Sequence, residues 1–264
     1  MCEGKEVNTR EGEVGAEGRA PPAVQPSSVF KELKLAGFED VQLQGVNLYD
    51  LYRMSGGGKN GFKYKSKYGN VVSLKGDFSI DAMTKTNIYF NGRDNVINIY
   101  GIKNVFGLHL ACVGGGTINF SSPNVVRGLT VMSSNGGVVS IGSDCLISRD
   151  VIIYASKAHG LYNVSDGERR FKQGVTVGDH VWLGQGVRLL SGASIGDGSV
   201  IGSYSVLARS VPNNCAAAGN PCRVTTHDIF WTDKAVPDDG NYFDMLQRSG
   251  KSRPRFVRFT QEGD

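Results

Sequence analysis

An aliphatic residue returns every six positions through the middle of the chain, and this period restricts the fold more than any other feature. One series begins at Val177 and continues, six residues apart, through Leu183, Leu189, Ile195, Ile201 and Leu207. A second series of small or branched residues runs two positions ahead of it, as Val175, Val181, Val187, Ala193, Ser199 and Ser205. Because residues two apart on a strand point to the same face, each unit is a short strand with two inward side chains, followed by a turn.

Stacked units of this kind bury their aliphatic residues as ladders along a common axis, which is the arrangement in a hexapeptide-repeat solenoid. An α-helix would instead need apolar residues at spacings of three and four. The 36 glycines are spread along 264 residues and suit many tight turns, whereas a glycine inside a helix costs about 1 kcal/mol. The sequence therefore predicts an all-β protein built as a parallel β-helix.

The same phase is present before residue 177, with one interruption. Ile141, Ile147 and Ile153 all precede Val177 by a multiple of six. The phase is lost at about 158–174, which we interpret as a loop extruded from the coil, and such loops on rigid scaffolds often carry function. Residues 86–137 are strand-like but irregular in period. We interpret them as degenerate early coils, so the predicted solenoid domain spans 86–225.

The N-terminal part of the chain does not follow the repeat. Residues 1–29 lack the apolar core of a signal peptide, so we expect a flexible leader and, by default, a cytoplasmic protein. The sequence has no apolar run of the ~18–20 residues that span a membrane. Residues 30–85 are expected to cap the solenoid, and within them aromatic residues alternate with Lys63, Lys65 and Lys67. This alternation is typical of an edge strand guarded by lysines, which we favour, or of a surface that faces a glycan.

Residues 226–264 are expected to form a second cap and a basic tail. The segment "QRSGKSRPRFVRF" holds five cationic residues and contributes to the net charge of +4. We favour a solvated tail, and the alternative is a weak contact with an anionic polymer or a membrane surface. No nucleic-acid-binding motif is present. The five cysteines are odd in number and form no CxxC pair, which predicts packed thiols rather than disulfides or a zinc site.

Three motifs follow one another in the second half of the chain: "GDHVWLG" at 178–184, the hexapeptides after it, and "AAAGNPCRV" at 216–224. Over about 138–223 they resemble the left-handed β-helix acetyltransferases of the hexapeptide-repeat superfamily. The stretch 159–184 is most similar to the capsular polysaccharide and polysialic acid O-acetyltransferases. The resemblance implies a left-handed coil, a homotrimer with active sites between subunits, acetyl-CoA as acyl donor, a glycan as acceptor and no metal.

Acetyl transfer to a hydroxyl needs a base, because an alcohol is hardly ionised at neutral pH, and histidine suits this role by its pKa. His159 lies at the start of the predicted loop and matches the catalytic histidine of the family by position. Its neighbours read "SKAHG", where the family has an aspartate-glycine-histidine run. We expect His180 to be structural, and the other two histidines match no motif. A backbone carbonyl, Ser156 or Asp150 could orient His159, and the residues alone leave this choice open.

The resemblance also assigns binding residues. Those that would meet coenzyme A are Gln185, Ser203, Ala208, Arg209, Gly219, Pro221 and Arg223. The two arginines would hold phosphates through their planar, doubly donating guanidinium groups. Those that would contact the acceptor are Trp182, Tyr154 and Lys157. For Trp182 a second interpretation, packing against a neighbouring subunit, stays open.

Other functions share parts of this sequence pattern. A γ-type carbonic anhydrase shares the repeat but needs three zinc-binding histidines, and no third histidine is in phase with His159 and His180. A serine acetyltransferase would need a helical N-terminal domain, which the polar, glycine-rich N-terminal part of this chain does not resemble. A non-catalytic binding or assembly subunit remains an alternative, as does an acetyltransferase for a small sugar or another small hydroxyl or amine acceptor.

Overall fold

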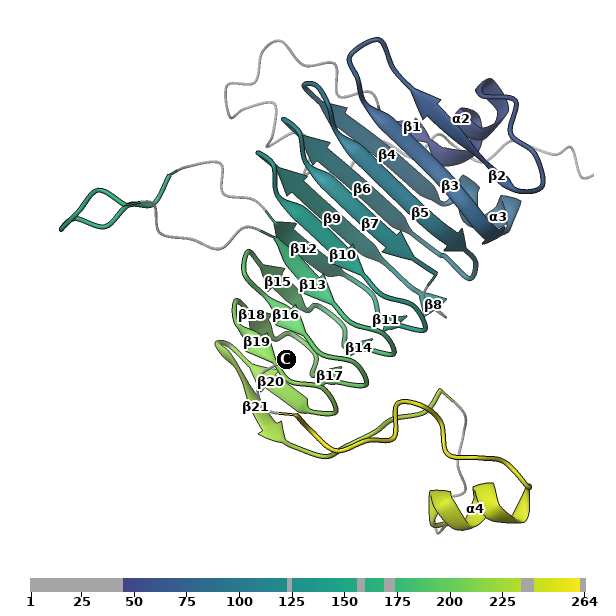
Figure 1. Ribbon diagram of the computed structural model, residues 1–264, viewed down its shortest axis with the longest axis vertical. Helices are drawn as coiled ribbons and strands as arrows, with labels where there is room; N and C mark the ends of the chain where they lie inside the picture. The colour runs from purple at the N-terminus through teal and green to yellow at the C-terminus, as the bar shows by residue number, and fades with distance from the viewer. Residues whose placement is uncertain (1–44, 123–124, 156–159, 169–173, 234–239, 262–264) are drawn as a thin grey trace, which may run out of the picture. The chain divides into compact units, whose positions relative to one another are not determined.

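Three β-sheets wrap around one core in the computed structural model (Figure 1), which describes residues 45–122, 125–155, 160–168, 174–233 and 240–261. All of these residues belong to one compact unit, 40–264. From residue 117 onward the chain visits the three sheets in turn, and each circuit adds one strand to each of them. The predicted parallel β-solenoid is therefore confirmed.

The strands of the described ranges follow one another within each sheet in a fixed spatial order. Sheet A contains β1 (Val46–Asn47), β4 (Thr86–Asn91), β6 (Leu108–Val113), β9 (Leu129–Ser134), β12 (Val151–Ala155), β15 (Arg188–Leu190) and β18 (Val206–Leu207). Sheet B contains β19 (Ser210–Val211), β16 (Ser194–Ile195), β13 (Val175–Val177), β10 (Val138–Ile141), β7 (Thr117–Ser121), β5 (Val96–Ile102), β3 (Val71–Phe78) and β2 (Gly61–Lys65). Sheet C contains β21 (Cys222–Thr226), β20 (Ala216–Gly219), β17 (Val200–Ile201), β14 (Trp182–Leu183), β11 (Leu146–Ile147) and β8 (Val125–Val126). The helices are α2 (Leu48–Met54), α3 (Ile80–Thr84) and α4 (Tyr242–Arg248).

The coils narrow along the chain. In the regular repeat, Leu183 lies opposite Ile201, three hexapeptide units further along. In the earlier coils, Asn98, Asn119 and Ser140 lie opposite one another at intervals of 21 residues. Strands there are longer: β5 has 7 residues, whereas β14 has 2. The irregular period before residue 138 is therefore the period of wider coils, and the predicted early coils are present.

The core consists of the ladders that the repeat predicts. In sheet B one ladder runs through Ile97, Ile118, Val139 and Val175, all at most 2% exposed. Burying one aliphatic side chain of this size contributes about 1.5–3 kcal/mol. Stacked ladders thus stabilise each coil through the coils on either side of it.

The edge between sheets B and C turns through left-handed backbone. Asp144, His180, Gly198 and Asn214 occupy the same place in successive coils, with φ values of 57°, 54°, 72° and 55°. Glycine, asparagine and aspartate adopt this conformation more readily than other residues. These residue types therefore recur in the sequence at the positions where the solenoid turns a corner.

The N-terminal end of sheet B is an edge strand. Strand β2 pairs antiparallel with β3 and is the last strand in the order of the sheet. Phe62 is buried and Tyr64 packs against the core, while Lys63 and Lys65 are exposed. The aromatic residues thus face the core and the lysines face solvent, as expected for the edge strand that the sequence favoured.

The last described residues of the chain, 255–261, lie against the solenoid, whereas α4 stands apart from the sheets (Figure 1). Arg255 forms ion pairs with Asp144 and Asp179, and Arg258 forms one with Asp197. The favoured prediction of a solvated tail is therefore wrong for these two arginines. None of the helices in the described part of the chain is long and apolar enough to span a membrane.

Candidate active site

The predicted base belongs to the segment that connects β12 to β13. His159 and Lys157 lie outside the described residues. After this segment, β13 continues the hexapeptide register of the preceding coil. Val139 lies opposite Val175, which is a whole number of hexapeptide units further along the chain. The described stretch 160–168 contains a tight turn, in which Asn163 N donates to Glu168 O at 2.9 Å. The segment thus adds residues beside the coil without adding a coil.

Several predicted coenzyme A residues gather at the edge between sheets C and A. Gln185 follows β14 and Ser203 follows β17, and both side chains are exposed. The Gln185 amide donates to the Tyr204 hydroxyl at 3.1 Å, and Gly219 N donates to Ser205 Oγ at 3.0 Å. This edge therefore presents amide and hydroxyl groups to solvent from two adjacent coils.

Tyr204 at this edge was missed in the sequence. It is 66% exposed and has φ 58°, in the corner position that Gly186 and Asp150 occupy in the two preceding coils. Its ring covers Gly186, where an added Cβ would come within 2.5 Å of the tyrosine ring. A tyrosine with left-handed backbone is uncommon. Counting the repeat forward from the corner residue Gly186 leads to Tyr204, and this unusual residue type at a corner was the signal available in the sequence.

The remaining coenzyme A candidates lie elsewhere on the last coils and not at one corner. Ala208 and Arg209 follow β18 at the edge between sheets A and B, and both are exposed. Arg223 lies on β21 opposite Ala218, just after Pro221, also exposed. Within the described ranges the ion pairs involve neither Arg209 nor Arg223. Arg223 donates to the backbone carbonyl of Cys222 at 2.9 Å.

The two described acceptor candidates lie on different faces. Trp182 is on the outer face of sheet C, between Leu146 and Val200, and is 39% exposed. Tyr154 is half-buried on the outer face of sheet A, next to Leu190. One chain therefore does not bring these two side chains together.

Trp182 has an aromatic neighbour from its own chain, which the sequence did not reveal. The ring centroids of Trp182 and Trp231 are 6.0 Å apart. Trp231 in turn stacks on His180, which is held on its other face by Phe256. His180 therefore has the structural surroundings that its motif position predicted.

Asp150 is paired with an arginine of the next coil. Its carboxylate forms an ion pair with Arg188 at 2.8 Å, and its backbone carbonyl accepts a second bond from the same guanidinium. His159 and Ser156 lie outside the described residues, so the group that orients the base stays a prediction.

His109 also lies on the outer face of sheet A, next to Tyr89, with ring centroids 6.4 Å apart. Its Nδ1 is buried and has no hydrogen-bond partner among the described residues. Burial lowers the pKa of His109, since a charged imidazole loses hydration there.

The cysteines in the described ranges are buried free thiols: Cys112, Cys145, Cys215 and Cys222. Burial raises the pKa of Cys145 to about 12 and raises that of Cys112 as well. These thiols pack in the core, as predicted, and do not form a reactive site. The described part of the chain also contains no group of three side chains suited to a metal ion.

The fold and repeat define the class of protein. A parallel solenoid with short strands and a six-residue period is a hexapeptide-repeat architecture, and the family model described as bacterial transferase hexapeptide (six repeats) matches residues 174–209. Over these residues the chain carries the hexapeptide repeat of that family, and it is similar to hexapeptide-repeat acetyltransferases.

Three similar proteins are acetyltransferases that act on, or are named for, polysaccharides. The chain is 34% identical over 106 residues to a polysialic acid O-acetyltransferase of Escherichia coli O1:K1 / APEC, a match that covers 38% of this chain and 34% of the relative. It is 34% identical over 128 residues to the putative lipopolysaccharide biosynthesis O-acetyl transferase WbbJ of Escherichia coli K12, with 45% and 64% covered. Its structure resembles that of the polySia-specific acetyltransferase NeuO, with a TM-score of 0.54, 28% identity, and 69% and 82% covered. The matched part thus spans about a third to two thirds of these curated relatives.

Proposed function

We propose that this protein is an acetyl-CoA-dependent O-acetyltransferase that modifies a hydroxyl of a glycan, such as a capsular or other surface polysaccharide. One observation carries the proposal. The coils that hold the exposed edge of Gln185 and Ser203 are the coils that match the transferase hexapeptide family. The similarity to polysaccharide O-acetyltransferases in both sequence and structure supports a glycan acceptor.

In the proposed reaction a glycan hydroxyl attacks the thioester carbonyl of acetyl-CoA. His159 takes the hydroxyl proton as the carbon–oxygen bond forms. The tetrahedral intermediate then collapses, the carbon–sulfur bond breaks, and the proton passes from His159 to the departing thiolate. A general base of this kind is typically worth about 10²–10⁴-fold in rate.

The residues present suit coenzyme A. Gly184 lets two coils approach closely at the exposed edge, since an added Cβ there would lie 2.7 Å from Ser203 N. A thin ligand arm can follow such an edge and use the Gln185 and Ser203 side chains as hydrogen-bond partners. Arg209 and Arg223, which are exposed, supply the positive charge that phosphates need.

The arrangement also supports a homotrimer with sites between subunits. Trp182 and Tyr154 lie on the outer faces of different sheets, so a site that uses both needs a second copy of the chain. We place the activity in the cytoplasm. Light scattering coupled to size exclusion would test the assembly, and a monomeric active enzyme would contradict it.

The decisive experiment combines donor binding with an acceptor panel. The purified full chain is titrated with coenzyme A by calorimetry and then incubated with acetyl-CoA and polysialic acid, neutral polysaccharides or small galactosides. Thiol release and mass spectrometry of the glycan report transfer. Acetylated polysaccharide is the expected product, whereas acetylation of small sugars alone would favour the small-acceptor alternative.

Failure to bind coenzyme A would instead favour a non-catalytic solenoid subunit. An Arg209→Gln, Arg223→Gln double variant tests whether these two side chains bind the donor. It removes two exposed charges that pair with no carboxylate among the described residues, so its fold should be unaffected.

A further inference from the structure

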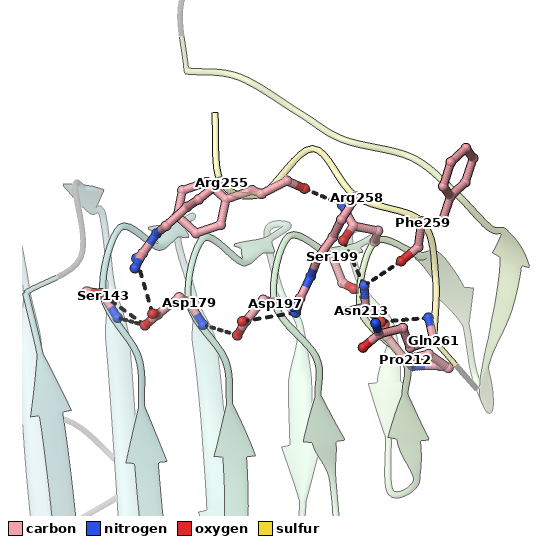
Figure 2. Close-up of polar contacts among 12 residues, drawn as sticks. Ser143, Asp179, Asp197, Ser199, Pro212, Asn213, Arg255, Arg258, Phe259 and Gln261 are labelled. Atoms are coloured by element: carbon pink, nitrogen blue, oxygen red, sulfur yellow. Dashed lines mark hydrogen bonds and ion pairs between the residues drawn. The ribbon is translucent and has the colours of Figure 1, made fainter. Parts of the chain in front are cut away.

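A C-terminal strap, residues 255–261, runs along the edge between sheets B and C (Figure 2). Arg255 lies 3.2 Å from Asp179 and 3.7 Å from Asp144, and Arg258 lies 3.2 Å from Asp197. These aspartates occur in three successive coils. The strap therefore follows the long axis of the solenoid across several turns.

The edge is built to receive the strap. One oxygen of Asp179 accepts bonds from the Ser143 backbone and hydroxyl at 2.8 and 3.0 Å, while the other faces Arg255. Asp197 divides its oxygens in the same way between Asp179 N and Arg258 (Figure 2). Each carboxylate thus links one coil to the next and to the strap. Because these ion pairs are partly exposed, each contributes little to the stability of the docked strap, and their main effect is to set its position along the edge.

Two buried asparagines anchor the strap at the last coil. Asn213 donates to Phe259 O at 3.0 Å and accepts from Gln261 N at 2.8 Å (Figure 2). Asn214 donates to Phe256 O and to Ile229 O, at 2.6 and 2.9 Å. Both asparagines are 0% exposed. The strap and the segment around residue 229 are therefore attached to one point.

This attachment assembles an aromatic stack. The His180 ring lies between Trp231, at 4.1 Å and 10°, and Phe256, at 4.0 Å and 6°. Trp231 Nε1 donates to His180 O at 2.9 Å, and the His180 Nε2 atom is 3.1 Å from Trp231 O. Trp231 then stands 6.0 Å from the exposed Trp182. Phe256, at the far end of the stack, thus helps to hold Trp231 in place.

We propose that the strap is a positioning element of the acceptor site, in which Phe256, His180 and Trp231 act through Trp182. The inference rests on the proposed function, because it assigns Trp182 to the glycan acceptor. An exposed indole that must first be ordered binds a ligand less tightly than one already held in place. Trp231 contacts both His180 and Trp182. Ordering Trp231 through the stack therefore restricts the Trp182 ring, and the apolar face of a sugar ring packs on that ordered ring.

The strap supplies its own matched control. Phe256 and Phe259 are three residues apart, but Phe256 stacks on His180 whereas the Phe259 side chain is 80% exposed. We compare the full-length wild type with Phe256→Ala, Phe256→Tyr and Phe259→Ala. Trp182 and Trp231 are the only tryptophans of the chain, so acrylamide quenching of intrinsic fluorescence reports their ordering independently of activity. Kinetics use acetyl-CoA with polysialic acid or, if that is not modified, with the panel glycan of highest turnover.

Phe256→Ala is expected to increase quenching and to raise the acceptor KM by about three- to tenfold, the effect of losing one aromatic contact. The kcat and the dissociation constant of coenzyme A should stay within about twofold of the wild-type values, because the strap acts on acceptor binding alone. Phe256→Tyr should restore both readouts, and Phe259→Ala should behave as wild type. A Trp231→Phe variant, which keeps a ring on His180, should raise KM in the same direction and covers the case in which Phe256→Ala does not fold.

Three results would overturn the inference. Equal acceptor KM values in Phe256→Ala and Phe259→Ala, with normal transfer by wild type, would refute the positioning role alone. Parallel losses in coenzyme A affinity and kcat would mean that the strap only maintains the fold. A wild-type protein that binds coenzyme A but acetylates no glycan would refute the proposed function, and the acceptor role of the strap with it.

Discussion

Replacing Asn214 removes the side chain that ties two distant segments to the last coil. Its amide donates to Ile229 O and Phe256 O, and its oxygen accepts from Asn213. Each such bond contributes about 0.5–1.5 kcal/mol, and buried carbonyls left without a donor add to the cost. We therefore expect Asn214→Gly, which tolerates the φ of 55°, to destabilise the C-terminal coils by about 2–4 kcal/mol.

Asn214→Ala should cost about 1 kcal/mol more, because left-handed backbone strains alanine and does not strain glycine. Asn104 is the matched control. It has φ 52°, is exposed, and makes no side-chain hydrogen bond within the described part of the chain. Asn104→Gly should therefore be nearly neutral, and Asn104→Ala should show the backbone cost alone.

Urea unfolding followed by tryptophan fluorescence suits this comparison, because Trp182 and Trp231 both lie at the affected end. Solenoids can lose terminal coils before the rest unfolds, so circular dichroism is recorded in parallel to separate local from global loss. An Asn214→Gly protein within about 0.5 kcal/mol of wild type would refute the anchoring role, given the bond strengths assumed. Equal values for the glycine and alanine variants would contradict the backbone argument.

Further outcomes are expected at the thiols and at the transfer site. His159→Ala should keep coenzyme A binding but lose about 10²–10⁴-fold in transfer rate, and near-normal turnover would exclude it as the base. Arg209→Gln and Arg223→Gln should each weaken coenzyme A binding measured by calorimetry, with little change in melting temperature; unchanged affinity would place the phosphates elsewhere. Cys112 and Cys145 should resist a thiol reagent until the protein unfolds. Because burial raises the pKa of Cys145 to about 12, its neutral thiol stabilises the fold below the usual thiol pKa, and stability should fall as pH rises from about 9 toward 12. A flat stability profile there, or rapid labelling of the folded protein, would contradict this burial.

The solenoid was predictable because its period is local. The spacing of Val177, Leu183 and Leu189 identifies inward positions without any knowledge of distant contacts, and the structure buries all three. The earlier coils were harder to read, because their wider turns contain longer strands and no regular hexapeptide unit. Parallel pairing between such coils depends on residues that the chain brings together only after a full circuit.

The candidate site was predictable only in part. Motif positions led to Gln185 and Ser203, and both are exposed on one edge. Tyr204, which receives the Gln185 amide, carries no motif signal beyond its corner position. The location of Trp182 and Tyr154 on different sheets follows from the path of the coil and not from their separation in sequence.

The sequence by itself determined the repeating unit, the inward ladders, the interruption before residue 174 and the hexapeptide-repeat fold, since each depends on residues within one or two turns. Only the tertiary structure decided the fate of the basic C-terminal segment. Composition made it look like a solvated tail, yet Arg255 and Arg258 meet carboxylates from coils much earlier in the chain. An unpaired cationic segment and a docked strap have the same composition. What distinguishes them is the row of aspartates and asparagines that stacking of successive coils aligns along one edge.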